Sequence, residues 1–444
     1  MRKLIFLISA LVISATMMAS DHVMAATKGE GRKANGEGTP AILNLSLKEA
    51  QEFAVKQNRS LRNASLAVQE AYAQRWQTIA AMLPQVDGSY SYSDMFNYKL
   101  DFNGMAMPMA NTGTLNITAG VGINGQAIAG ALLNTIAIDM KKIALEQSET
   151  QLRGNVMSSY VSVLALQSIS NLLDSSLVNI QELETMTRNA VEAGAAESTS
   201  ADQIRVRVNT LKNSINSQQR NIELAINSLK VLLDVPVETE LVLTENLDDV
   251  LAPDRVVSLL GEQFAMENNL NYQLLQKQVE LAKTNLHMAG WAYGPTVSLA
   301  YQYSEVQKIG DGFGGMSMPH VLNLSVKMPL WSSGKRAAGV VEKKIALEEA
   351  KNTLAETTGN LEIQYRQLCY NLTNAYETYL NEKDNMDVSQ RVFASATNKY
   401  KYGASSNLEL TNASNDLINA QSSYVQSILT LVKAQVELEK FLNN

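Results

Sequence analysis

Residues 83–93 read Leu-Pro-Gln-Val-Asp-Gly-Ser-Tyr-Ser-Tyr-Ser, where a proline ends a helical pattern and an alternating strand pattern follows. Residues 294–304 repeat this arrangement as Gly-Pro-Thr-Val-Ser-Leu-Ala-Tyr-Gln-Tyr-Ser. The two prolines, Pro84 and Pro295, are 295 − 84 = 211 positions apart, and at the same offset the five residues from Gly104 match the five from Gly315 without a gap. Self-similarity over half the chain indicates a duplicated unit. We expect a first repeat at 43–233, a linker at 234–253 and a second repeat at 254–444.

Each repeat contains a very long helical pattern, at about 126–193 and about 334–402, with no proline inside it. At ~1.5 Å rise per residue each would form a rod roughly 100 Å long. In the second pattern an apolar residue recurs every seven positions, as in a coiled-coil seam, at Leu347, Leu354, Leu361, Leu368 and Ala375. Each pattern ends at a glycine, Gly194 or Gly403, after which a second helix returns. The sequence therefore predicts one long helical hairpin with a tight tip in each repeat.

Four segments alternate between apolar and polar or small residues, two in each repeat, at 85–92, 115–124, 296–303 and 322–330. A half-buried sheet in a water-soluble protein would give the same alternation. The length of the segments, their hydrophilic polar sets and the tyrosines near two strand starts favour tilted membrane strands instead. Beyond the N-terminal segment we expect no apolar stretch long enough for a membrane-spanning helix.

Four strands cannot close a barrel, because a sheet edge exposed to lipid leaves unsatisfied backbone groups in hydrocarbon. Closed membrane barrels start at about eight strands. We therefore expect a homotrimer, in which three copies form a twelve-stranded barrel continuous with a bundle of helical rods. The fold class expected is mainly α with membrane β.

The N-terminus has the pattern of a secretory signal peptide at 1–25, with Arg2 and Lys3 before an apolar run and Ala25 at a small-residue cleavage site. A membrane anchor is the alternative, and it would need a longer apolar stretch. A flexible leader is expected at 26–42. Cys369 is the single cysteine, so no internal disulfide is expected. We expect its thiol to be part of a packed core. The formal net charge of −7 argues against nucleic acid as the main partner.

Three motifs together resemble the TolC family of outer-membrane efflux proteins, over about 43–442. They are Ala-Ala-Met-Leu-Pro-Gln-Val at 80–86, Met-Pro-Leu-Trp-Ser-Ser-Gly-Lys at 328–335, and Tyr402-Gly403 before Leu-Glu-Leu-Thr-Asn-Ala at 408–413. The resemblance implies a trimeric β-barrel in the outer membrane of a Gram-negative bacterium, continuous with an α-helical barrel across the periplasm. It also implies a passive exit duct of a tripartite efflux or type I secretion system, opened when a periplasmic adaptor protein and an inner-membrane transporter engage its periplasmic end.

The resemblance further implies roles for particular residues. In such channels acidic residues after the second tip glycine ring the periplasmic constriction, and those positions are Glu409 and Asn412 here. Asn412 departs from the family's aspartate, so we expect a single ring of Glu409 carboxylates. Equally, Glu409 could be a solvated residue at a helix start, favoured there by the helix dipole. The implied adaptor-docking residues at the tips are Gly194, Ala195, Ser200, Gly403, Ala404 and Ser405, and the barrel switch points are Pro84, Pro295, Pro329 and Gly334.

Two methionine-rich loops contain Met105, Met107, Met316 and Met318. Thioether sulfurs can bind Cu(I), but methionine as a flexible apolar filler is the favoured interpretation, so we expect no metal. The sequence offers no recoverable nucleophile, acid–base pair or metal triad, and we expect neither an enzyme nor a cofactor. The alternative to a channel is a periplasmic coiled-coil scaffold or a surface adhesin. That alternative would explain the heptads but not the four matched strands.

Overall fold

The computed structural model describes residues 42–96, 98–102, 104–194, 197–250, 253–314 and 318–442. The predicted signal peptide, the predicted leader up to residue 41, Ala195 and Met316 lie outside these residues. The chain divides into two compact units. Among the described residues, the strand unit consists of Leu66–Lys142 and Leu274–Ala355, and the hairpin unit of 42–65, Ile143–Gln273 and 356–442. Each unit takes segments from both halves of the chain.

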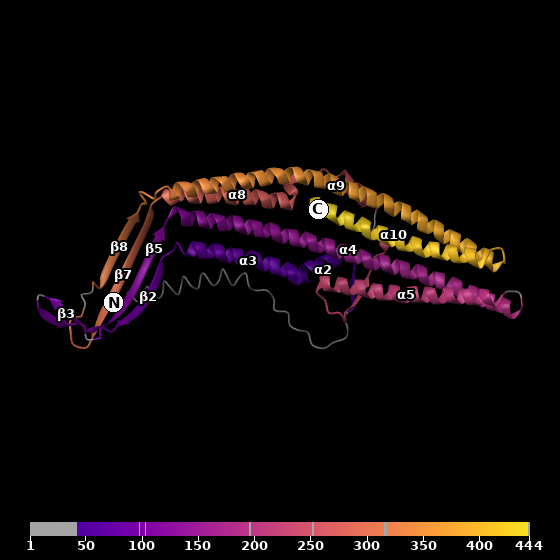
Figure 1. Ribbon diagram of the computed structural model, residues 1–444, viewed down its shortest axis with the longest axis horizontal. Coiled ribbons are helices and arrows are strands. Elements are labelled where there is room, and N and C mark those ends of the chain that lie inside the picture. Colours follow the sequence, from indigo (N-terminus) through magenta and orange to yellow (C-terminus); the bar gives the residue numbers. More distant parts are fainter. Residues whose placement is uncertain are drawn as a thin grey trace. The chain divides into compact units, whose positions relative to one another are not determined.

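The strand unit contains a four-stranded sheet in the order β2-β5-β7-β8, in which all neighbours are antiparallel (Figure 1). The strands are β2 (Gln85–Ser93), β5 (Asn111–Ile123), β7 (Thr296–Ile309) and β8 (His320–Lys327). They coincide with the four alternating segments of the sequence, with β5 and β7 longer than predicted. Pro84 and Pro295 directly precede β2 and β7, where the missing N–H and fixed φ of proline suit a strand start.

The register places the apolar residues of all four strands on one face. Val86 pairs with Ala119, Ala119 with Tyr301, and Tyr301 with Leu322. Directly opposite residues share a face and successive residues alternate, so the four apolar sets coincide. The apolar residues of this face include Val86, Tyr90, Tyr92, Leu115, Ile117, Ala119, Val121, Ile123, Val297, Leu299, Tyr301, Tyr303, Ile309, Leu322, Leu324 and Val326. Glu305, opposite Leu115, and His320, opposite Tyr303, lie on the same face. The opposite face is polar, made chiefly of Ser, Thr, Asn and Gln.

The last strand ends earlier than predicted. β8 stops at Lys327, whereas the alternating pattern predicted a strand to Leu330. Proline at 329 has no N–H to donate to a ladder, and Ser333 and Gly334 both have positive φ, at 47° and 81°, so the chain turns sharply before the next helix.

The sequence repeat therefore does not extend to the strand pairing. Val86 pairs with Ala119, but Val297, its counterpart 211 positions on, pairs with Val326. The position equivalent to Ala119 would be Leu330, which lies outside β8. The second hairpin is consequently shifted by 330 − 326 = 4 residues relative to the first.

The structure also contains a separate two-stranded hairpin, β3–β4, which the sequence did not predict. β3 (Lys99–Phe102) and β4 (Met105–Pro108) pair antiparallel within the connection from β2 to β5. Met105 and Met107 therefore lie in a strand rather than a loop. The sequence signal was missed because each run is short and Gly104, with φ of 85°, interrupts them.

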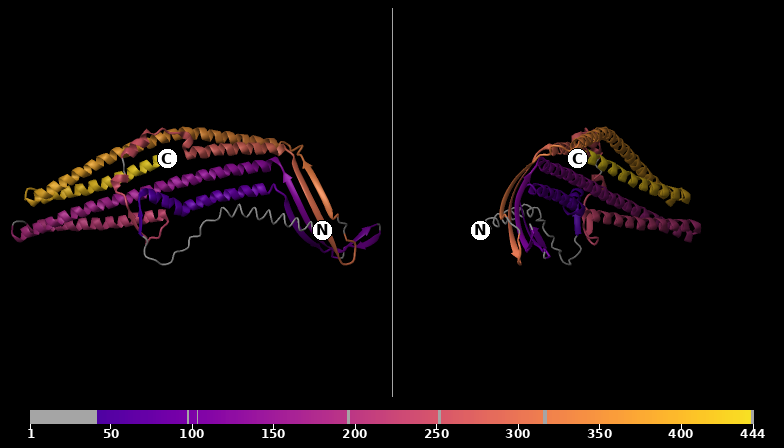
Figure 2. Two further views of the ribbon diagram at one scale, coloured as in Figure 1. Left: turned by 180° about the vertical axis from the view of Figure 1, so that it is seen from behind. Right: turned by 60° about the vertical axis from the view of Figure 1, so that its left-hand side comes forward.

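The two predicted long helices begin in the strand unit and continue through the hairpin unit. They are α4 (Gly125–Glu192) and α9 (Lys335–Lys401), and they return as α5 (Ser198–Leu233) and α10 (Asn407–Leu442). Figure 2 shows α4 beside α5 and α9 beside α10. The predicted seam of α9 is buried at Leu361, Leu368, Leu372 and Ala375, and Tyr379 of α9 stacks on Tyr424 of α10 with ring centroids 5.9 Å apart.

Short elements complete the two units. In the hairpin unit, strand β1 (Ile42–Leu45) pairs parallel with β6 (Glu240–Leu243). The remaining helices are α2 (Leu47–Gln57), α3 (Arg59–Ala80), α6 (Leu247–Val250), α7 (Pro253–Gly261) and α8 (Leu270–Gly290), with 3-10 turns at Met266–Asn268 and Trp291–Tyr293. Helix α2 begins with a capping box between Ser46 and Glu49.

The expectation of no helix long and apolar enough to cross a membrane was wrong for α4. Among the described residues α4 contains an 18-residue window with a mean hydropathy of 1.3, half of which is buried. A helix in a protein core passes the same test of length and composition.

Candidate functional site

The tip of the second helical hairpin is built from local signals in the sequence. Gly403 has φ of 72°, the left-handed conformation that glycine adopts without steric cost. Its N–H donates to the carbonyl of Tyr400, and the N–H of Ala404 donates to the carbonyl of Lys399 at 2.8 Å. This pair of bonds is a Schellman motif, which ends α9 and satisfies two of its last carbonyls. Gly194 has the same φ of 72° at the end of α4.

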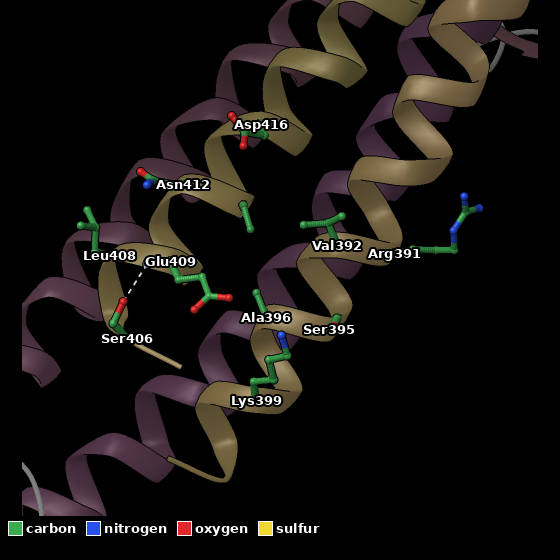
Figure 3. A pocket seen from close by; sticks show the side chains of 11 residues that line it. Arg391, Val392, Ser395, Ala396, Lys399, Ser406, Leu408, Glu409, Asn412 and Asp416 are labelled. Atoms are coloured by element: carbon green, nitrogen blue, oxygen red, sulfur yellow. Dashed lines mark hydrogen bonds between the residues drawn. The ribbon is translucent and has the colours of Figure 1, made fainter. Parts of the chain in front are cut away.

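A groove next to this tip contains both predicted constriction residues. Glu409 and Asn412 are exposed on the first turns of α10. Figure 3 shows the Glu409 carboxylate directed toward α9, where Ala396 and Lys399 lie. The groove is lined from α9 by Arg391, Val392, Ser395, Ala396 and Lys399, and from α10 by Ser406, Leu408, Glu409, Asn412, Ala413 and Asp416. The groove therefore has the acidic residues Glu409 and Asp416 on its α10 side and the basic residues Arg391 and Lys399 on its α9 side.

Glu409 also acts at the start of α10. Its backbone N–H donates to Oγ of Ser406, and its Oε2 accepts a hydrogen bond of 2.8 Å from Oγ of Ser405. A carboxylate in the first turn is stabilised by the positive end of the helix dipole. Glu409 therefore lies in the first turn of a helix, as the second interpretation expects. The ring of carboxylates stays a prediction.

Two polar links join the hairpins near their tips, and sequence reasoning missed both. Arg207 of α5 donates to the carbonyl of Thr411 at 2.6 Å and to Oδ1 of Asn415 at 2.9 Å, both on α10. Lys401 of α9 lies 2.8 Å from Oε2 of Glu182 on α4. Burial lowers the pKa of Arg207 from its usual range. No local pattern could reveal these contacts, because the partners are about 200 residues apart in the sequence.

The other predicted residues lie at the two tips and in the strand unit. Ser200 is in the first turn of α5, and Ala404 and Ser405 are in the turn after α9. The switch points belong to the strand unit, where Arg336 donates to the carbonyl of Pro329 and lies over the ring of Tyr293, 5.0 Å from its centroid.

The described methionines of the two predicted loops, Met105, Met107 and Met318, are exposed. The nearby His320 contacts a tyrosine, because its Nδ1 lies 2.7 Å from the hydroxyl of Tyr301. Among the described residues no group of three or more His, Cys, Asp or Glu side chains is arranged to hold a metal ion.

Known outer-membrane efflux proteins are similar to this chain in sequence. The family model "Outer membrane efflux protein" matches residues 52–234 and 263–444. The chain is 22% identical over 303 residues to the toluene efflux pump outer membrane protein TtgC of Pseudomonas putida, covering 67% of this chain and 62% of that protein. It thus spans less than two thirds of that relative. It is also 22% identical over 402 residues to toxin and drug export protein A of Aggregatibacter actinomycetemcomitans, covering 88% of this chain and 85% of that protein.

Solved outer-membrane channels share the fold. CusC superposes with a TM-score of 0.73 at 18% identity, covering 92% of this chain and 94% of CusC. CmeC of Campylobacter jejuni gives 0.69 at 16% identity, covering 89% of this chain and 85% of CmeC. The open state of MtrE of Neisseria gonorrhoeae gives 0.68 at 15% identity, covering 94% and 96%. With this TolC-like fold, and with a family model that matches most of its length, the chain belongs to the outer membrane efflux protein family.

Proposed function

We propose that three copies of this chain form a passive exit duct through the outer membrane, as the outer component of a tripartite efflux or type I secretion system. The proposal depends mainly on one observation. A single chain supplies an open sheet with one apolar face and, among the described residues, two edge strands, β2 and β8. Membership of the efflux family favours this duct over a periplasmic scaffold or an adhesin.

Barrel closure explains why several copies are needed. In hydrocarbon every backbone N–H and C=O must be paired, so an open edge cannot remain in the membrane. Along the sheet the strand directions alternate from β2 to β8. Pairing β8 of one copy with β2 of the next therefore continues the antiparallel order. Three copies give twelve strands, which lies within the range of about 8 to 26 seen for such barrels.

The two faces of the sheet then have separate roles. The apolar face is exposed in a single chain, notably at Leu322, Leu324 and Val326 of β8. A patch of this kind marks an interaction surface, here with lipid. The exposed Trp331 after β8 would lie at the membrane–water interface, where tryptophan is enriched. The polar face would line a water-filled passage.

The hairpin tips are the proposed gate. A ring of Glu409 carboxylates from three copies would set the charge of the constriction, with Asn412 one turn further along α10. The links of Arg207 to α10 and of Lys401 to α4 hold the two hairpins of one chain together. A hydrogen bond to a charged group contributes about 1.5–3 kcal/mol when it is buried, and an exposed ion pair such as Lys401 with Glu182 contributes about 0–1 kcal/mol. Binding of a partner at the tips could offset this amount and open the gate.

The partners proposed are a periplasmic adaptor protein and an inner-membrane transporter. The adaptor would contact the tip residues Gly194, Ala195, Ser200, Gly403, Ala404 and Ser405, whose small side chains permit close helix packing. The transporter would supply the energy, because the duct itself is proposed to have no enzymatic activity. Two relatives are named for toluene efflux and for toxin and drug export, and we propose toxic small molecules as the cargo.

Disulfide cross-linking of the two edge strands tests the proposal. In a Cys369→Ser background, Ser89→Cys on β2 is combined in turn with Val321→Cys, Asn323→Cys and Ser325→Cys on β8, which lie on the same face of the sheet as Ser89. At least one pair is expected to give dimers and trimers in outer-membrane fractions, with no larger species. The control pair Ser89→Cys with Gln302→Cys places the second cysteine on the inner strand β7 and should give none. Monomers for every β2–β8 pair, or a ladder that continues beyond the trimer, would contradict the proposal.

A further inference from the structure

The β3–β4 hairpin has two chemically different faces. Leu100 of β3 pairs directly with Met107 of β4. The N–H of Met109 donates to the carbonyl of Tyr98 at 2.9 Å, which extends the pairing beyond the strand ends. By strand alternation Tyr98 and Leu100 share one face with Met105 and Met107. The other face carries Lys99, Asp101, Ala106 and Pro108.

The apolar face is uncovered within the described part of the chain. Tyr98 is 60% exposed, Leu100 39%, Met105 70% and Met107 36%. An isolated two-stranded hairpin is at best marginally stable in water, and it requires packing against another element. The apolar face therefore needs an occupant.

The base of this hairpin is fixed to the sheet. Phe313, in the connection from β7 to β8, donates its N–H to the carbonyl of Pro108 at 2.7 Å and accepts from the N–H of Ala110 at 3.1 Å. Gly312 permits this approach, because a Cβ at its position would lie 2.6 Å from the Pro108 carbonyl oxygen. Ala110 is buried. The connection thus holds the hairpin in a defined orientation, with its apolar face presented outward.

The position of the hairpin in the chain indicates what covers that face. The hairpin follows β2, the edge strand that pairs with the neighbouring copy in the proposed barrel. Figures 1 and 2 show it projecting past the end of the four-stranded sheet. It is therefore continuous with the proposed boundary between copies. We infer that a second copy of this chain covers the apolar face of Tyr98, Leu100, Met105 and Met107, which gives the trimer an interface outside the barrel ladder.

This inference rests on the proposed function, and a pair of charge substitutions tests it. Met107→Glu places a carboxylate on the apolar face, and Ala106→Glu places one on the opposite face of the same strand. The half-life of the purified trimer in SDS at a fixed temperature is the readout. Met107→Glu is expected to shorten it about tenfold or more relative to Ala106→Glu, a factor that corresponds to about 1.4 kcal/mol. Equal half-lives for the two variants would overturn the inference.

A second measurement keeps the test decisive if Met107→Glu fails to assemble. Met107→Cys in the Cys369→Ser background is labelled with an environment-sensitive fluorophore in the intact trimer. Cover by a neighbouring copy predicts a shielded fluorophore that lipids with bromine or nitroxide groups do not quench. Quenching by such lipids would assign the face to the membrane, and full access to an aqueous quencher would show that nothing covers it, so both results overturn the inference. Failure of the wild-type protein to form a trimer would instead refute the proposed function.

Discussion

The hydroxyl of Tyr160 donates a hydrogen bond of 3.0 Å to the carbonyl oxygen of Leu45, so the buried middle of α4 holds the end of strand β1. Leu45 also accepts from the N–H of Thr244, which follows β6. Burial, followed by the nearby Glu245 carboxylate, raises the pKa of Tyr160 to about 12. Both causes favour the neutral hydroxyl that donates this bond.

Replacement of Tyr160 by Phe tests this contact. We expect the variant to lose about 1 kcal/mol of stability at pH 8, because one buried hydrogen bond is removed. The raised pKa makes the neutral Tyr160 stabilising below its ordinary value of 10.0, and this contribution is lost as the pH rises toward about 12. The difference between wild type and Tyr160→Phe in denaturant unfolding should therefore shrink between pH 10 and pH 12. A difference that stays constant over this window would contradict the assignment.

Helices α4 and α10 approach each other closely at Gly154. A Cβ at Gly154 would lie 2.5 Å from Cγ1 of Val436, whereas a Cβ at Gly359, inside α9, meets nothing within 4 Å. Gly154→Ala is expected to lower the thermal stability because Val436 must shift. Gly359→Ala is the matched control and should be neutral or stabilising, by up to about 1 kcal/mol, since alanine has the higher helix propensity. Equal effects of the two substitutions would show that the close approach is unimportant.

The assignment of the sheet faces predicts opposite results at adjacent positions of β8. Leu324→Arg places a charge on the apolar face, which costs about 2–4 kcal/mol near the middle of a bilayer. Ser325→Arg places the same charge on the polar face, where water can solvate it. The yield of trimer in the outer-membrane fraction should fall for Leu324→Arg and stay near the wild-type value for Ser325→Arg. The reverse order would mean that the faces have been assigned the wrong way round.

The two roles of Glu409 can be separated in planar bilayers. Glu409→Gln removes a carboxylate from each copy and should reduce the selectivity of the pore for cations over anions. Ser405→Ala removes the hydrogen bond to Oε2 of Glu409 but keeps the charge, so selectivity should be retained. Reversal potentials across a salt gradient provide the measurement. Unchanged selectivity in Glu409→Gln would leave this residue only its place in the first turn of α10.

Arg207 tests the proposed gate. Arg207→Ala removes both donations to α10. We expect a larger resting conductance in planar bilayers and greater sensitivity of the cells to large antibiotics that an intact outer membrane excludes. Arg207→Lys keeps the charge but loses the planar fork that contacts two acceptors at once, so its effect should be intermediate. Resting conductance equal to that of wild type in Arg207→Ala would exclude this link from the gate.

The features that the sequence predicts well are those with a local period. The seven-residue recurrence from Leu347 predicts a buried seam, and the alternation around Tyr90 and Tyr301 predicts strands on either side of a proline. The tips follow from two glycines that occupy the left-handed region. Each of these signals depends on neighbours within a few residues.

The features that were missed depend on distant contacts or on interrupted patterns. The alternating pattern predicted that the fourth strand extends to Leu330. In the structure it ends at Lys327, because Pro329 has no N–H for strand pairing. The β3–β4 hairpin is held by Phe313, about 200 residues away, and the Arg207 link has the same non-local character. The grouping of the two halves into repeats, and the roles of the tip residues, stay predictions.

In the proposed assembly, the sheet of one chain becomes part of a barrel shared by three chains. Native mass spectrometry of the wild-type protein, extracted in detergent from purified outer membranes of its own cells, measures this directly. We expect an assembly with three times the mass of the mature chain. A monomer, or a protein found only in the soluble periplasmic fraction, would contradict it.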